Sequence, residues 1–309
     1  MINILGKRYY YFALSLLIII PGLIIILLDG LSLSIDFTGG TYLEVEFGSG
    51  TPPQPAQVVL LYKELGVDDV LVQTTNRGSL VARSSFLDDE TRSKVLSMME
   101  DQFGQSVTVL RYESVGPTIG QEVTSRAAIA VTIAAIGVLI YIVFAFRGIQ
   151  NALRYGVCGI IAMLHDVLIV ISLAAIGGVL WGWQVDSLFL TALLTVIGFS
   201  VQDKIVVFDR IRENSTIYRR LRYETLVNHS IVQTLQRSIN TQLMTVEFML
   251  LSLVLFGGVT LREFSLILLV GLLSGTYSSI FIAAPILVVW ENREWRTWFK
   301  PRAKREATA

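Results

Sequence analysis

Charge is scarce in this sequence. Of its 309 residues only 16% are Asp, Glu, Lys or Arg, whereas 53% are hydrophobic. A soluble domain is about a quarter charged. The shortage of charge therefore excludes an ordinary soluble protein and indicates a chain that is embedded in a membrane.

Cysteine and histidine are also scarce. The single cysteine, Cys158, excludes a disulfide framework, and His165 and His229 lie far apart without cysteine neighbours. The sequence contains neither a phosphate-binding P-loop nor the Gly-x-Ser-x-Gly motif of serine hydrolases. We therefore expect no metal site, no cofactor and no enzymatic activity.

Long apolar runs are what the sequence has in quantity. A helix needs about 20 apolar residues to cross the hydrocarbon core of a bilayer. The first candidate run is too long for the apolar part of a secretory signal and lacks a cleavage site, so we expect it to remain as an anchor. Six transmembrane helices are predicted, the fifth with the help of a polar first turn: 10–28, 127–146, 155–180, 187–208, 241–256 and 264–290.

Lys and Arg are distributed unevenly around these helices. If the six helices alternate in direction, one side of the membrane receives the basic stretches 7–8, 147–154, 209–224 and 291–309. The other side receives the segment 29–121, in which carboxylates outnumber Lys and Arg. Because basic loops stay in the cytoplasm, both termini are predicted to be cytoplasmic and the segment 29–121 external. The basic stretches are interpreted as topology signals and contacts for membrane lipids, with no nucleic acid involved.

The external segment has a secondary-structure pattern of its own. Its residues alternate as strands at 41–47 and 106–115, and a helical period separates these strands from a central hairpin. The order strand, helix, strand, strand, helix, strand is that of a ferredoxin-like βαββαβ domain, which we interpret as a docking module. The predicted division of the chain is therefore a cytoplasmic N-terminus with the first helix (1–29), an external ferredoxin-like domain (30–124), a helical bundle (125–290) and a basic cytoplasmic tail (291–309).

An Asp–Lys pair, Asp203 and Lys204, interrupts the fourth apolar run. A charged side chain inside a bilayer costs a few kcal/mol or more, so Asp203 is a functional candidate; the alternative is an interfacial position near the headgroups. At about 1.5 Å per residue, Asp203 and Arg237 lie at depths that differ by about one helical turn, so the two are expected to pair. Thr241 follows Arg237 by four residues on one helix face. Lys204 points about 100° away from Asp203 and is expected to extend to the headgroups.

Two further carboxylates fall inside the apolar runs. Asp166 lies near the middle of the third run, where it could take part in a proton relay or could join helices through hydrogen bonds, for example to His165. Glu247 lies ten residues beyond Arg237, too far for a direct pair, and could extend the path or face a partner helix. A lone chain cannot easily hide all these charges from lipid, so we expect a partner with a related helical bundle.

Six polar motifs in these segments form a pattern that extends over nearly the whole chain. Together, and in this order, they resemble the SecF family of bacterial protein-export subunits. The motifs are "IDFTGGT" (35–41), "VGPTIGQE" (115–122), "LHDV" (164–167), "GFSVQDKIVVFDRIREN" (198–214), "NHSIVQTLQRSINTQLMT" (228–245) and "GTYSSIFIAAP" (275–285).

The resemblance implies a partner and a mechanism. SecF-like chains lie in the bacterial inner membrane with the domain 30–124 in the periplasm, pair with SecD and form a pump of the RND superfamily. They use the proton gradient to help pull unfolded preproteins from SecYEG in SecA-dependent export; YajC is a further candidate partner. By matching motifs, the proton pathway is expected at Asp203, Arg237 and Thr241, with Asp166 as an additional candidate. Structural roles are expected for the remaining motif residues Asp36, Gly39, Gly40, Gly116, Pro117 and Gly275. Gly39 and Gly40 are expected to form a tight turn, Gly275 to allow close helix packing, and Pro285 to kink the sixth helix near its inner end.

The sequence departs from the family pattern beside Asp203. The family has small or polar residues where this chain has Gln202 and Lys204. The coupling ion therefore stays open between H⁺ and Na⁺. Two other functions also stay open, namely half of a small-molecule or lipid exporter of the RND superfamily and a non-conducting scaffold subunit of the translocase.

Overall fold

The computed structural model describes residues 3–48, 52–75, 78–145, 147, 152–242 and 248–296. The chain divides into two compact units. Leu33–Ile129 forms one, which we call the sheet unit, and Met1–Ser32 with Ala130–Ala309 forms the other, which we call the helical unit.

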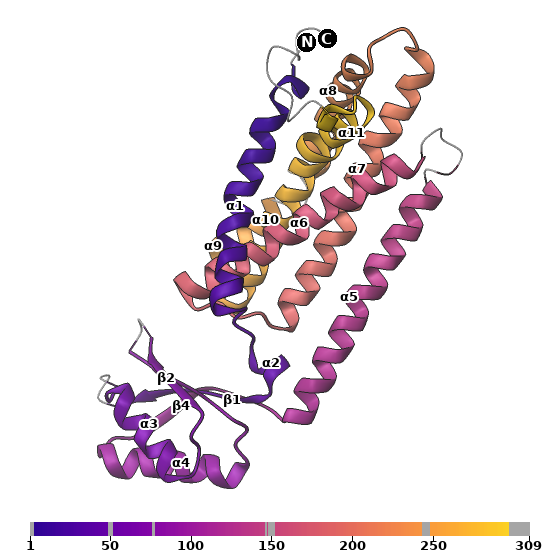
Figure 1. The fold of residues 1–309 in the computed structure, drawn as a ribbon. Coiled ribbons are helices and arrows are strands. Elements are labelled where there is room, and N and C mark those ends of the chain that lie inside the picture. Colours follow the sequence, from indigo (N-terminus) through magenta and orange to yellow (C-terminus); the bar gives the residue numbers. More distant parts are fainter. Residues whose placement is uncertain are drawn as a thin grey trace. The chain divides into compact units, whose positions relative to one another are not determined.

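The sheet unit has the element order that the sequence pattern predicts. Its four strands form an antiparallel sheet in the order β2-β3-β1-β4, and α3 and α4 contribute to a single hydrophobic core with the sheet (Figure 1). The core is centred on fully buried side chains such as Leu43, Tyr62 and Met99. The elements are α2 (Ile35–Thr38), β1 (Gly40–Phe47), α3 (Pro55–Glu64), β2 (Val70–Thr74), β3 (Leu80–Ser84), α4 (Asp89–Phe103) and β4 (Val107–Val115).

Two adjacent glycines form the entry to the sheet. The short helix α2 starts at Ser34, whose hydroxyl accepts the N–H of Asp36 at 3.2 Å, and the carboxylate of Asp36 suits the positive end of the helix. Gly39 and Gly40 then have φ values of 71° and 128°, which L-residues with a side chain rarely adopt. The prediction of a tight turn at these glycines is confirmed.

The chain leaves the sheet unit directly beside the turn at which it enters the sheet. Pro117 begins α5 (Pro117–Ala145), a position where proline's fixed φ suits the first helical turn. A Cβ on Gly39 would lie only 2.9 Å from the Cα of Pro117, and one on Gly120 would lie 2.7 Å from the nitrogen of Gly39. The two glycines thus allow the entry and exit of the sheet unit to pack backbone against backbone.

Replacing Gly40 by Ala is expected to destabilise the sheet unit by about 2 kcal/mol or more. The new Cβ would lie 2.6 Å from the carbonyl oxygen of Ser84 in a backbone conformation that Ala disfavours. Limited proteolysis of the full chain in mild detergent should cut the sheet unit faster. Gly116→Ala is the matched control, because a Cβ there meets nothing within 4 Å. Equal cleavage rates in the two variants would contradict this account of Gly40.

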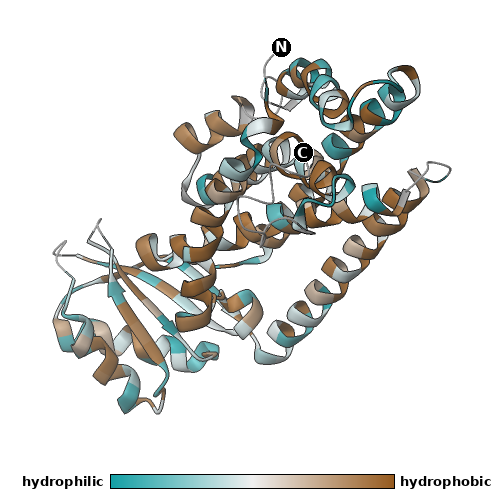
Figure 2. Cartoon of the chain, turned by 45° about the horizontal axis from the view of Figure 1, so that its top comes forward, coloured by the Kyte–Doolittle hydropathy of each residue, from teal (hydrophilic) through white to brown (hydrophobic). Residues whose placement is uncertain are grey.

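The helical unit is built from long apolar helices, and Figure 2 shows the hydrophobic colouring along most of the length of α5. In the part of the chain that the structure describes, five helices are long and apolar enough to cross a membrane: Leu5–Asp29, Pro117–Ala145, Leu153–Trp181, Ser187–Ile217 and Leu261–Glu291. The helices are α1 (Arg8–Asp29), α5, α6 (Ala152–Trp181), α7 (Ser187–Ile217), α8 (Tyr223–Gln242), α9 (Phe248–Phe256), α10 (Val259–Ser278) and α11 (Ala284–Glu291).

These five helices coincide with five of the six predicted transmembrane segments. The remaining predicted segment, 241–256, is the fifth in chain order. It includes residues 243–247, which lie outside the described residues. The described residues on either side of that gap belong to α8 and α9.

Small residues bring the helices of this unit close together. A Cβ on Gly22 of α1 would lie 2.2 Å from the Cβ of Ser172 on α6, and one on Gly271 of α10 would lie 2.2 Å from a methyl group of Val196 on α7. A Cβ on Gly275 would lie 3.3 Å from the Cα of Ser200. These contacts agree with the structural role predicted for Gly275, because close backbone approach is what small residues allow in membrane helices.

The last transmembrane helix changes its winding before Pro285. A π-helical segment, Ser279–Ala283, separates α10 from α11, and Pro285 falls in the first turn of α11. Proline lacks an N–H and its ring clashes with the preceding turn of an α-helix. A wider π-helical turn ahead of Pro285 avoids this clash. A π-helical segment thus lies directly ahead of the proline that was predicted to kink this helix, and Ser279 in it reaches Asp203 of α7.

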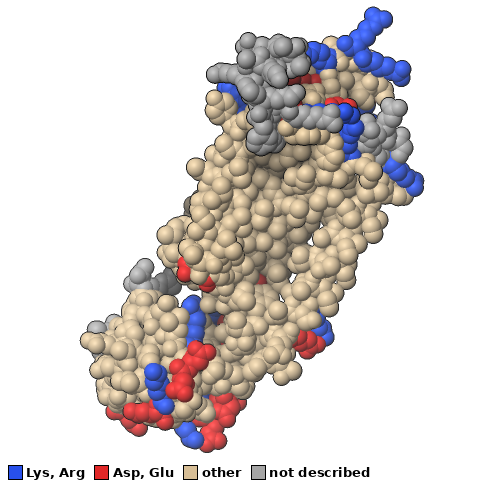
Figure 3. Space-filling model, viewed as in Figure 1, with Lys and Arg blue, Asp and Glu red and all other residues tan. Residues whose placement is uncertain are grey.

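Charged residues gather at one end of the helical unit. Figure 3 shows Lys and Arg where α7 ends and α8 begins. At this end Arg8 pairs with Glu224 at 2.8 Å and Glu294 at 2.6 Å, and the Asn228 side chain accepts the N–H of Ile4 at 2.9 Å. The start of α1 is thereby attached to α8 and to the segment after α11. Residues 297–309 of the predicted basic tail lie outside the described residues.

Candidate functional site

One face of α7 carries a continuous stripe of buried positions at helical spacing. Most of these positions are apolar, as expected for packing against α6 and α10. The stripe also contains Ser200, Asp203 and Lys204, which are 2%, 6% and 1% exposed. Polar side chains that cannot reach solvent must find partners inside the protein, so this stripe defines the candidate site.

Asp166 on α6 is the centre of the first polar cluster. Its carboxylate is completely buried and accepts hydrogen bonds from Ser274 at 2.7 Å, Ser200 at 2.6 Å and Ser278 at 2.6 Å. His165 Nδ1 lies 3.0 Å from its Oδ1. The hydroxyls come from α7 and α10, so Asp166 joins three helices. The interpretation of Asp166 as a packing device, including the contact with His165, agrees with this arrangement.

Lys204 is the cationic partner of Asp166. Its Nζ lies 2.7 Å from Asp166 Oδ2 and 3.0 Å from the carbonyl oxygen of Ser200, and it also donates to the Ser200 hydroxyl. The prediction that Lys204 extends to the headgroups is wrong. The buried carboxylate of Asp166 on the neighbouring helix draws the ammonium inward, since each buried charge would be costly without the other.

Asp203 forms the second cluster, with different partners. Ser238 on α8 donates to Asp203 Oδ1 at 2.8 Å, and Ser279 at the start of the π-helical segment donates to Oδ2. Among the described residues Asp203 has no ion pair. Asp203 is therefore a buried carboxylate held by two hydroxyl groups, whereas Asp166 is held by hydroxyls and by the amino group of Lys204.

The expected pair between Asp203 and Arg237 is not found in the described part of the chain. Arg237 is exposed on the surface of α8, and its neighbour Ser238 faces Asp203 instead. One residue along a helix turns the side chain by about 100°, so a correct depth does not guarantee a correct direction. Thr241 is also exposed, and its hydroxyl donates to the carbonyl of Arg237 at 2.7 Å.

More charged side chains are buried within this chain than we expected from the sequence. Asp166 and Asp203 are both buried within the helical unit, so the expectation that a partner is needed to cover them is wrong for these two residues. Arg237 remains exposed, and Glu247 lies outside the described residues. Sequence reasoning also missed the serines that supply most of the donors, although Ser200, Asp203, Lys204 and Val207 follow one helical stripe.

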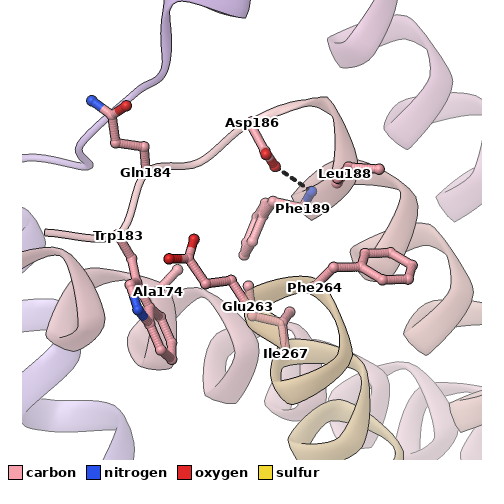
Figure 4. Close-up of a pocket in the computed structure, with 9 residues that line it drawn as sticks. All are labelled: Ala174, Trp183, Gln184, Asp186, Leu188, Phe189, Glu263, Phe264 and Ile267. Atoms are coloured by element: carbon pink, nitrogen blue, oxygen red, sulfur yellow. Dashed lines mark hydrogen bonds between the residues drawn. The ribbon is translucent and has the colours of Figure 1, made fainter. Parts of the chain in front are cut away.

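A small pocket of about 20 Å³ lies at the other end of the same helices, where the α6–α7 turn meets α10. Figure 4 shows Asp186 accepting the N–H of Phe189, at 2.8 Å, as the N-cap of α7. Glu263 extends into this pocket from the first turn of α10. The pocket is too small for an organic substrate, so it supplies no alternative site to the two carboxylate clusters.

Comparison with known proteins connects this geometry to a family. Residues 95–293 match the family described as "Protein export membrane protein SecD/SecF, C-terminal", and residues 24–50, which contain Gly39 and Gly40, match the "SecD/SecF GG Motif". The chain belongs to the SecD/SecF family. Its SecF-like character is clear from two relatives named "Protein translocase subunit SecF", from Anaerolinea thermophila (69% identity, 98% of this chain and 99% of the relative) and Thermobaculum terrenum (45%, all of both chains).

A solved relative has the same fold. The crystal structure of SecDF from Thermus thermophilus, titled a translocon-associated membrane protein, matches 94% of this SecF-like chain with 34% identity and a TM-score of 0.79. This chain spans 39% of that SecDF chain. In the Thermus protein, a SecF-like part is thus one portion of a longer polypeptide.

Proposed function

We propose that this SecF-like chain forms half of a proton-driven pump with a SecD-like subunit and assists the export of unfolded preproteins from the SecYEG channel. The observation that carries the proposal is the contrast between the two buried carboxylates. Asp166 has a fixed cation at 2.7 Å, whereas Asp203 has hydroxyl partners alone among the described residues.

Asp203 is the proposed proton carrier. An ionised carboxylate that is buried in apolar surroundings without a counter-charge costs free energy. Binding a proton removes that charge, so the site favours proton uptake by Asp203. Asp166 is less suited to this role, because protonating it would leave the ammonium of Lys204 buried without an opposite charge. We assign Asp166 the role of a structural anchor for α6, α7 and α10.

Ser279 offers a way to pass the protonation state of Asp203 to the backbone. A hydroxyl has one proton to donate, and Ser279 has two acceptors in reach, Asp203 Oδ2 and the carbonyl oxygen of Thr276 at 2.8 Å. When Asp203 is protonated it can donate to Ser279, which then donates to Thr276. Protonation would thereby change the hydrogen bonding where α10 becomes π-helical, a winding that is common at functional sites.

Arg237 and Thr241 are proposed to face the partner subunit. They lie four residues apart on α8 and both are exposed in the isolated chain, which supports a role on an intersubunit surface of the pathway. An arginine that faces lipid is costly, and a SecD-like helical bundle would cover it. The SecDF polypeptides of Bacillus subtilis and Thermus thermophilus, which this chain matches at 36% and 35% identity, support that pairing.

The topology proposed for this function has six transmembrane helices, with α9 completing the fifth. Both termini are proposed to be cytoplasmic in the bacterial inner membrane, and the sheet unit is proposed to be a periplasmic ferredoxin-like domain that contacts preprotein. The gathering of Lys and Arg at the α7–α8 end supports this orientation. No step of the mechanism requires enzymatic chemistry.

Affinity purification of the tagged chain from native membranes is the test of the assembly. A SecD-like subunit should be recovered in near-equal amount, with SecYEG at lower yield, and quantitative mass spectrometry measures both. Arg237→Ala should reduce recovery of the SecD-like subunit, whereas Arg212→Ala, which removes an exposed arginine of α7 that pairs with Asp209 within its own helix, should not. Recovery of the chain alone would favour the alternative that it is half of a small-molecule or lipid exporter. Recovery with SecYEG but without a SecD-like chain would favour a non-conducting scaffold subunit.

A further inference from the structure

The ammonium group of Lys204 fills a small, oxygen-lined site inside the helical unit. A lysine ammonium has three N–H donors. Here the three meet Asp166 Oδ2 at 2.7 Å, the Ser200 carbonyl at 3.0 Å, and the Ser200 hydroxyl. The side chain is 1% exposed, so water does not compete for these oxygens.

The same oxygens suit a small free cation. Hard cations such as Na⁺ prefer carboxylate, carbonyl and hydroxyl oxygens, and this site supplies one of each. The hydroxyls of Ser274 and Ser278, 2.7 and 2.6 Å from the Asp166 carboxylate, lie in the same cluster. The described part of the chain contains no His, Cys, Asp and Glu grouping that would suit a transition metal instead.

We propose that this is a latent sodium site and that Lys204 occupies it as a tethered cation. The ammonium is covalently attached to the chain and pairs with Asp166 at 2.7 Å, so a free cation has neither room nor electrostatic reason to bind there. Asp203 lacks such a cation among the described residues and is held by the hydroxyls of Ser238 and Ser279 instead. The further consequence, that Lys204 keeps Na⁺ away from Asp166 and leaves Asp203 as the coupling carboxylate, rests on the proposed function.

The test removes the tethered cation and asks whether sodium replaces it. Lys204→Ala leaves a cavity beside the ionised Asp166, and Na⁺ should bind in it. Thermal unfolding of the full-length chain in its purified complex is measured in NaCl and in choline chloride at equal ionic strength. At a sodium concentration of about 100 times Kd, the unfolding midpoint of Lys204→Ala should rise by roughly 3–8 °C relative to choline. The wild-type midpoint should be the same in both salts.

Two matched variants define the site. Lys204→Met removes the charge but fills the space, and Asp166→Asn combined with Lys204→Ala removes the anionic ligand, so neither should respond to sodium. An equal midpoint of Lys204→Ala in both salts would overturn the proposal, and so would failure to recover this variant in sodium. The readout is stability and not export, so a failure of proton coupling leaves this test unaffected.

Discussion

The Asp203→Asn variant is expected to assemble normally and to lose all stimulation of export by a proton gradient. Asparagine has nearly the same shape as aspartate, and its amide can keep hydrogen bonds to Ser238 and Ser279. It cannot take up or release a proton in the physiological range. The measurement is the export of a reporter preprotein in inverted membrane vesicles, with and without an imposed gradient.

A matched control lies on the same helix. Asp209 is exposed and pairs with Arg212 at 2.6 Å, so Asp209→Asn changes a charge of the same kind outside the buried site. Gradient stimulation in this variant should stay within about twofold of wild type, because an exposed ion pair contributes about 0–1 kcal/mol. Wild-type stimulation in Asp203→Asn would rule out Asp203 as the proton carrier.

The second large effect concerns the pair Asp166–Lys204. Asp166→Asn leaves a buried ammonium without its counter-charge and is expected to destabilise the helical unit by about 3–5 kcal/mol. Lys204→Met leaves the Asp166 carboxylate with its serine donors, so this variant should be destabilised less than Asp166→Asn. The double variant buries no charge and should recover much of the loss, because replacing a whole buried pair is often nearly neutral.

A double-mutant cycle measures this coupling. Thermal unfolding midpoints of the wild type, both single variants and the double variant are compared in one detergent and salt. If the destabilisations of the single variants add in the double variant, the two residues are not coupled and the ion pair at 2.7 Å does not contribute as described.

The sequence predicts the architecture well because apolar length and periodicity are local properties. Five transmembrane helices, the glycine turn at residues 39–40 and the strand–helix order of the sheet unit all follow from short segments. Asp203 also stands out, since a carboxylate inside an apolar run is rare. These features need no knowledge of which helices become neighbours.

The partners inside the bundle could not be predicted in the same way. Rise per residue fixes the depth of a side chain but leaves its direction undetermined, so Arg237 was expected where Ser238 lies. The destination of Lys204 depends on α6 packing against α7 with Asp166 at matching depth. Serine donors such as Ser274 and Ser279 do not differ from other small residues of a membrane helix until the neighbouring carboxylate is known.

The central claim is that a proton gradient drives this chain through Asp203. It is tested most directly in proteoliposomes that contain the purified complex with SecYEG, SecA and a preprotein stalled in the channel. A proton gradient alone should accelerate release of the preprotein, a protonophore should abolish the acceleration, and a sodium gradient alone should have no effect. Acceleration that survives the protonophore, or that follows the sodium gradient, would contradict the account.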